Sequence, residues 1–297
     1  ISYFDRFGSL QDLDKLITLV QQKQLSTFEK FLTDTLSTPE KHSFEPYGWE
    51  PESYNKPIST LPSLGQLYDL KGTIAFRQNR LHTALAAFEK LPANYWEDNY
   101  EFSSMFTHDI FVDAESFPWD RHRSGICNKA VVVKKMIELQ ELAAKPGPRQ
   151  AEAAYILANA YFNTSYWGHS WMMYSYSWSR NDWGAPLGLA DEKAIYHPNS
   201  KGYHKVYFQL SRAMRYYQRT LISSSDPELA AKAMYMIGYC DKYAKFGNGE
   251  LDYYPWKDQK VYVSPVFNTF RARFNHTLTY YECLKTCPEL ADYVKSR

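Results

Sequence analysis

The chain has 297 residues, and its 34 basic and 33 acidic side chains leave a formal net charge of +1. This balance, without a long basic run, argues against a nucleic-acid-binding protein, because phosphate contacts supply most of the affinity of such proteins. No stretch approaches the roughly 20 consecutive apolar residues of a membrane-spanning helix. The composition is that of a globular protein, long enough for one large domain or two ordinary ones.

The N-terminal part of the chain is predicted to be helical. A run that opens at Ser9 carries Leu13 and Ile17 at helical spacing. From Ser26 the letters STFE have the form of a capping box, in which the serine hydroxyl caps the backbone and the glutamate reaches back. Residues 1–63 are therefore predicted to form a helical hairpin followed by a loop.

Helical patterns continue along the rest of the chain. We expect a helix pair over residues 64–92 and single helices over residues 124–144, 151–163 and 203–222. Another helix is predicted to start at Asp226, which would cap it, with Pro227 at the first helical position and Glu228 near the positive end of the helix dipole. The tail after Pro265 is also predicted to be mostly helical. Strand signals are thin, so the predicted fold class is all-α.

Residues 65–92 resemble a tetratricopeptide (TPR) repeat, a helix pair with small residues where the two helices cross. Gly72 lies in the first helix, and Ala84 and Phe88 lie in the second at the spacing of the motif. The two small residues would let the backbones approach, and the phenyl ring would fill the space beside them.

Two other segments, around residues 151–163 and 213–241, resemble parts of the same motif. The residues expected to pack between the helices of such repeats are Tyr68, Gly72, Ala84, Phe88, Ala158, Tyr161, Ala213, Tyr217 and Gly238. Their small positions lie much farther apart than the roughly 34-residue period of a regular array. We therefore expect a single domain over residues 1–297, an irregular α-α superhelix of TPR-like hairpins. The helix pairs would lie within residues 64–178 and 200–297, with long inserts at residues 93–123, 179–200 and 245–264.

These features are similar to uncharacterised bacterial cell-envelope TPR-like repeat proteins, in which phrases like AYILANAYFNTSYWGHSW and YYECLKTCPELADYV recur. The resemblance implies a non-enzymatic protein–protein interaction scaffold, part of an assembly in the periplasm or at the outer-membrane surface. It implies no catalytic residue, and we also expect no cofactor and no metal. Because the chain starts at Ile1, any signal peptide or lipid anchor is expected upstream.

Residues 166–184 hold four of the eight tryptophans. We expect Tyr166 to Tyr176 to form a buried helix that packs on residues 151–163, because a helix apolar on most sides is usually enclosed by its neighbours. A loop should follow, and its candidate ligand or partner contacts are Trp178, Arg180, Asn181, Asp182 and Trp183. Exposed rings there favour an alternative function, a glycan-binding protein similar to the SusD type, which also uses TPR-like helix pairs. An α-helical hydrolase is a third, weaker alternative.

Other reactive side chains match no known motif. The insert from His108 to His122 holds two histidines and four carboxylates, but its spacing fits no metal-binding signature, and we interpret it as a solvated loop. Cys127 follows this insert without a motif that would make it a nucleophile. Cys283 and Cys287 are one helical turn apart, and we expect them to be free thiols.

Overall fold

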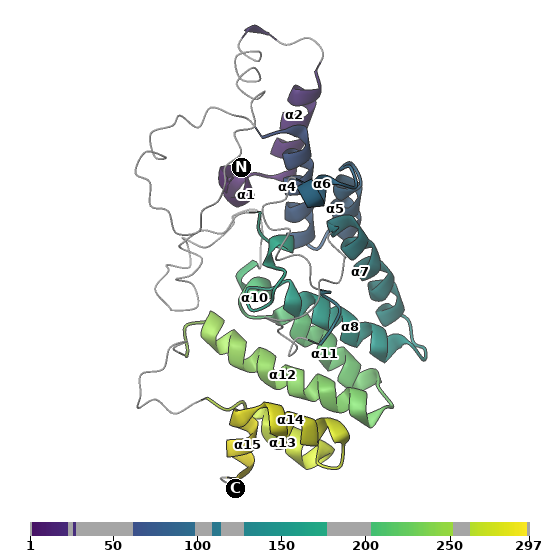
Figure 1. Ribbon diagram of the computed structural model, residues 1–297, viewed down its shortest axis with the longest axis vertical. Coiled ribbons are helices and arrows are strands. Elements are labelled where there is room, and N and C mark those ends of the chain that lie inside the picture. Colours follow the sequence, from purple (N-terminus) through teal and green to yellow (C-terminus); the bar gives the residue numbers. More distant parts are fainter. Residues whose placement is uncertain are drawn as a thin grey trace.

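The computed structural model describes residues 2–22, 26–27, 62–98, 109–113, 128–176, 203–251 and 262–295. Every regular element within these ranges is a helix, which confirms the predicted all-α class. Figure 1 shows the N-terminal helices towards one end of the longest axis of the molecule and the C-terminal helices at the other.

The helices fall into three groups along this axis. The first group contains α1 (Ser2–Phe7), α2 (Leu10–Gln21), α4 (Leu64–Arg77), α5 (Leu81–Phe88) and α6 (Tyr95–Asp98). The middle group contains α7 (Lys129–Ala144), α8 (Gln150–Asn163), the 3-10 helix η2 (Trp171–Met173), α10 (Tyr203–Tyr207) and α11 (Ser211–Ser223). The last group contains α12 (Pro227–Gly247), α13 (Val266–Phe274), α14 (Leu278–Thr286) and α15 (Pro288–Lys295). Among these described helices, none is both long and apolar enough to cross a membrane.

Several helix starts follow from local capping. Ser9 and Asp12 cap α2 reciprocally, each side chain accepting a hydrogen bond from the other residue's backbone N–H. The predicted start of α12 is confirmed, since Asp226 Oδ1 accepts a hydrogen bond of 2.9 Å from the backbone N–H of Glu228. Helix α7 begins at Lys129 rather than at residue 124, because the preceding Asn128 is extended and caps the helix with its side chain. The helix expected after Ser26 falls almost entirely outside the described residues.

Each long helix packs mainly on the helices that are next to it in the chain. Helix α2 packs on α4, α4 on α5, α5 on α7, α7 on α8, α8 on α11, α11 on α12, and α12 on α13 and α14. One hydrophobic core therefore continues from α4 to α15, and a smaller cluster lies between α2 and α4. This sequential packing brings α8, α12 and α14 together around the cavity described below.

Two pairs of helices cross closely at small residues that the sequence predicted. An added Cβ at Gly72 in α4 would lie 2.3 Å from the ring of Phe88 in α5. An added Cβ at Gly238 in α12 would lie 2.6 Å from the ring of Phe267 in α13. The other residues expected to pack between helices are enclosed as well. Tyr68 is half-buried, and the buried ones are Ala84, Ala158, Tyr161, Ala213 and Tyr217. A glycine facing a phenylalanine ring thus occurs in both the first and the last group of helices.

The prediction of one helix over residues 203–222 is wrong. The helix is interrupted at Leu210, which has a left-handed backbone with φ of 54°. The backbone carbonyls before this residue accept hydrogen bonds from another segment: Trp167 Nε1 donates to the carbonyl of Phe208 at 2.7 Å. This external contact replaces helical hydrogen bonding and separates α10 from α11.

The prediction of a helix from Tyr166 to Tyr176 is also wrong. After α8 ends, the chain turns, and the backbone N–H of Ser170 donates to the carbonyl of Asn163 at 2.8 Å. Gly168 permits this turn, because an added Cβ would lie 2.3 Å from the same carbonyl oxygen. The segment contains only the short η2, whose residues are at most 6% exposed. Its side chains are buried or half-buried, but the helices that pack on α8 are α7 and α11.

Candidate functional site

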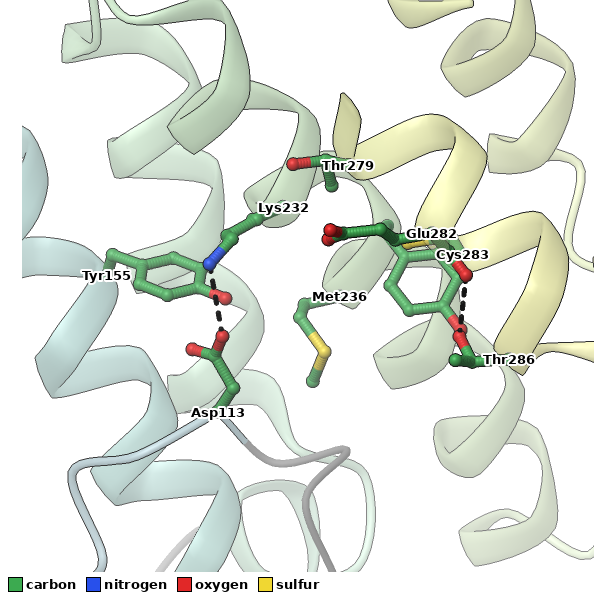
Figure 2. A pocket seen from close by; sticks show the side chains of 9 residues that line it. Asp113, Tyr155, Lys232, Met236, Thr279, Glu282, Cys283 and Thr286 are labelled. Atoms are coloured by element: carbon green, nitrogen blue, oxygen red, sulfur yellow. Dashed lines mark hydrogen bonds and ion pairs between the residues drawn. The ribbon is translucent and has the colours of Figure 1, made fainter. Parts of the chain in front are cut away.

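A cavity of about 270 Å³ lies where α8, α12, α14 and residues 109–113 meet (Figure 2). Its lining combines carboxylates, an ammonium group, hydroxyls and apolar side chains. The lining residues are Asp113, Tyr155, Lys232, Tyr235, Met236, Thr279, Glu282, Cys283 and Thr286. Four segments that are distant in sequence therefore contribute to one site.

The two helices that line most of the cavity do so with regular spacing. Helix α12 contributes Lys232, Tyr235 and Met236, which are three and four residues apart and so share one helix face. Helix α14 contributes Thr279, Glu282, Cys283 and Thr286 at the same helical spacing. The cavity is the space that these two facing surfaces leave between them.

Glu228, at the start of α12, fixes the position of α14. Its carboxylate accepts hydrogen bonds of 2.9 Å from the backbone N–H groups of both Leu278 and Thr279. These bonds satisfy N–H groups in the first turn of α14 that have no partner within the helix. The backbone hydrogen bond from Thr279 is the main cause that holds the pKa of Glu228 below its ordinary value. One side chain of α12 therefore sets the register of the opposite cavity wall.

Asp113 is held at the cavity by α8. Asn159 Nδ2 donates to Asp113 Oδ1 at 3.1 Å, and Tyr217 OH donates to Asn159 Oδ1 at 2.6 Å. The amide of Asn163 donates to the carbonyls of Ile110 and Val112. These contacts anchor residues 109–113 on the scaffold, so the carboxylate has a defined place beside α12.

The charged groups lie on opposite sides of the opening. Lys232 Nζ donates to Asp113 Oδ2 at 3.3 Å, and the two side chains are 43% and 44% exposed. Figure 2 shows the carboxylate of Glu282 directed into the opening from the other side, with Met236 between the two walls. Among the described residues, no ion pair involves Glu282. The opening thus carries two carboxylates and one ammonium group.

The interior of the cavity is apolar. Tyr155, Tyr235, Met236 and Cys283 are at most 7% exposed, whereas Glu282 and Thr286 are exposed. Phe267 supports the cavity wall behind Tyr235, because the two rings are stacked with their centroids 5.9 Å apart. The site therefore has a buried apolar base and a charged, solvent-accessible rim.

A second group of charges lies between α4 and α7 and is fully buried. Lys129 Nζ on α7 donates to Asp69 Oδ1 and Thr73 Oγ1 on α4, each at 2.9 Å. Burial raises the pKa of Asp69 and lowers the pKa of Lys129, while their mutual attraction opposes both shifts. Because both side chains are 0% exposed, this pair joins helices and is closed to ligands.

The same buried region attaches the N-terminal helix. Arg77 Nη2 on α4 donates to Asp5 Oδ1 on α1 at 2.9 Å, with both side chains 1% exposed. Asp5 Oδ2 also accepts a hydrogen bond of 3.1 Å from the backbone N–H of Tyr176. Tyr176 ends the described part of the aromatic segment, so this segment takes part in holding α1.

The residues predicted to contact a ligand or partner, from Trp178 to Trp183, lie outside the described residues, as do His108, His122 and Cys127. Two carboxylates of the insert are described. Asp109 caps the local turn by accepting from the backbone N–H of Phe111 at 2.9 Å, and Asp113 reaches the cavity. Within the described ranges, no group of three or more His, Cys, Asp or Glu residues could hold a metal ion.

The described cysteines Cys240, Cys283 and Cys287 are buried and form no disulfide, as expected for the last two. Burial raises the pKa of the Cys240 thiol, which opposes formation of a thiolate. Cys287 Sγ accepts a hydrogen bond of 3.4 Å from the backbone N–H of Leu290 at the start of α15. Cys240 therefore serves packing and Cys287 serves capping. Cys283 forms part of the cavity wall.

Neither Lys232 nor Glu282 belongs to a recognisable sequence motif. The only available signal was their spacing from neighbours on the same helix face, which many solvated helices share. In comparisons with known proteins, no family model, no curated protein and no solved structure matches the chain.

Proposed function

We propose that the chain is a non-enzymatic scaffold that binds another protein, and that the cavity between α12 and α14 is part of its partner-binding surface. The observation that carries this proposal is the sequential packing of the helices, each mainly on its neighbours in the chain. Repeat arrays built in this way present extended surfaces that hold peptides or other proteins. The resemblance of residues 65–92 to a TPR repeat supports the same function.

The size and character of the cavity also support a protein partner. Its volume of about 270 Å³ is below the roughly 300–1,000 Å³ of typical small-molecule sites. A larger partner could insert one side chain into it and make its remaining contacts on the surrounding helices. The half-exposed charges of Lys232 and Asp113 would then lie at the rim of the interface.

The glycan-binding alternative depends on exposed rings at Trp178 and Trp183, which lie outside the described residues. In the described part of the aromatic segment, Trp171 and Tyr174 are buried against the core and offer no stacking platform. The scaffold is therefore the function that the described residues support best.

We further propose that this scaffold acts in a bacterial envelope, as the resemblance to envelope TPR-like proteins implies. Fractionation of the cells that produce the full-length protein tests this location. Recovery with the periplasm or the outer membrane is expected, and recovery only with cytoplasmic proteins would contradict it.

Co-purification on an affinity tag, under native conditions and from the cells that produce the protein, tests the scaffold function. A specific protein partner should be retained by the wild type and lost on Thr286→Trp, because the added ring would block the exposed rim of the cavity. Thr18→Trp on α2 is the matched control. Both threonines are exposed, and each hydroxyl donates to the carbonyl four residues earlier. Absence of any specific protein partner of the wild type would contradict the proposed function.

A further inference from the structure

We infer that the cavity between α12 and α14 binds a basic side chain, a lysine or an arginine, of the partner protein. This inference rests on the proposed scaffold function and specifies the chemistry that its cavity recognises. Three features carry it: the charge of the rim, the apolar base, and the position of Glu282.

The charge of the rim favours a cation. Asp113 and Glu282 contribute two negative charges and Lys232 contributes one positive charge, which leaves a formal charge of −1. Lys232 already pairs with Asp113 at 3.3 Å, whereas no ion pair joins Glu282 to a described residue. An incoming ammonium or guanidinium group would therefore find one carboxylate without a counter-charge, and an incoming anion would meet a lysine that is already paired.

The shape of the site suits a long side chain with a charged end. Lysine and arginine carry an apolar stem that is readily buried while the charged head stays near water. Here Met236 and the Tyr155 ring provide an apolar surface inside the cavity, and Glu282 lies at the exposed rim. Figure 2 shows the Glu282 carboxylate directed into the space above Met236, where the head of such a side chain would lie. Aromatic rings also attract cations, so the Tyr155 ring adds to the preference.

The main alternative occupant is an acidic group that would bind Lys232. The two possibilities respond oppositely to one substitution. Removing the Lys232 charge would take away the only cation among the described residues that line the cavity, and would leave their formal charge at −2. A site for a basic group should then bind more tightly, and a site for an acidic group should bind more weakly.

Binding can be measured by NMR with ¹³C-labelled methionine methyl groups, using Met236 as the reporter. The protein has seven methionines, and comparison with Met236→Leu identifies the signal. The probes are Nα-acetyl-lysine methylamide, its arginine equivalent and, as the uncharged match, Nα-acetyl-norleucine methylamide. We expect saturable shifts of the Met236 signal with the two basic probes and a weaker effect of the norleucine probe. Raising the salt concentration should weaken the basic probes, since exposed charges are screened.

Three variants test the charge argument. Glu282→Gln should weaken the lysine probe by about two- to fivefold, the range of an exposed ion pair. Glu138→Gln, an exposed glutamate on α7, is the matched control and should change nothing. Lys232→Met should strengthen binding of the lysine probe by a similar factor. Equal binding of the norleucine and lysine probes, or weaker binding of the lysine probe by Lys232→Met, would overturn the inference.

A further probe separates a protein side chain from a free amine. The lysine amide should bind more tightly than n-butylammonium, because its peptide groups can make further contacts at the exposed rim around Thr286. Tighter binding of n-butylammonium would contradict a protein side chain as the occupant. These outcomes are independent of co-purification: a retained partner together with failure of the basic probes would overturn this inference and leave the scaffold function standing.

Discussion

Two regions of the molecule each contain an aspartate paired with a lysine, and the two pairs differ in distance and in exposure. In the first pair, Lys129 Nζ lies 2.9 Å from Asp69 Oδ1, and both side chains are 0% exposed. In the second pair, Lys232 Nζ lies 3.3 Å from Asp113 Oδ2, and the side chains are 43% and 44% exposed. The first pair lies in a closed core between α4 and α7, and the second lies at the rim of a cavity.

The difference in burial gives the two ion pairs different physical properties. A buried pair must stay paired, because a single buried charge without its partner is very unfavourable. An exposed pair contributes little to stability and can exchange partners with water or a ligand. We therefore assign Lys129 and Asp69 to holding helices together, and Lys232 and Asp113 to the proposed partner-binding surface.

The largest expected effect is at the buried pair. Lys129→Met should lower the free energy of unfolding by about 3–5 kcal/mol, because it leaves Asp69 buried without its counter-charge. Unfolding in urea, followed by circular dichroism, measures this change. The double variant Lys129→Met/Asp69→Leu should recover most of the loss. A loss below about 1 kcal/mol in the single variant would contradict a structural role for the pair.

The close helix crossings should respond alike at both ends of the molecule. Gly72→Ala should destabilise the protein by about 1–3 kcal/mol, because the added methyl group would press against the Phe88 ring. Phe88→Leu in the same chain should restore part of this loss by making room. The corresponding change Gly238→Ala, against Phe267, should cost the same amount or less, since its contact is longer. Thermal unfolding of the four proteins measures these differences, and a more stable Gly72→Ala variant would show that α4 and α5 do not cross so closely.

The wall of the cavity should depend on pH through Glu228. Its folded pKa lies below the ordinary value of 4.5, so its contribution to stability is complete above that pH and disappears as the pH falls through the folded pKa. Glu228→Gln should therefore lower stability by about 1 kcal/mol at pH 7, a typical value for loss of a helix cap. The difference from the wild type should narrow as the pH falls below 4.5 and through the folded pKa. A difference that is unchanged or widens on acidification would disprove the capping role.

The smallest stability effect is expected at the exposed pair. Lys232→Met should change the free energy of unfolding by less than about 1 kcal/mol, because an exposed ion pair contributes little. Urea unfolding under the conditions used for Lys129→Met gives a direct comparison. A loss of stability as large as that of Lys129→Met would place Lys232 among the structural residues and remove the distinction between the two ion pairs.

Much of the helical structure could be predicted because its causes are local. The caps at Ser9 and Asp226 and the apolar spacing of Leu13 and Ile17 depend on residues within one or two turns. The failures have long-range causes. The break at Leu210 accompanies hydrogen bonds from residues 166 and 167, and the turn after Asn163 brings α11 rather than the next segment onto α8.

The cavity could not be predicted for a similar reason. In the sequence, Asp113 is one of four carboxylates in an insert without a motif, and its neighbour Lys232 is 119 residues away in the chain. Glu282 has ordinary helical surroundings, and its position opposite Lys232 follows from the capping of α14 by Glu228. The buried pair has the same property, since Asp69 and Lys129 are separated by 60 residues.

The most direct test of the proposed division between core and recognition surface is site-specific photo-cross-linking. Benzoylphenylalanine replaces Thr286 at the cavity rim in one protein and Thr18 on α2 in another, and both are irradiated in the cells that produce the chain. The expected result is a cross-link to a partner protein from position 286 and none from position 18. A partner cross-linked from position 18 but not from position 286 would contradict the assignment of the cavity as the partner-binding surface.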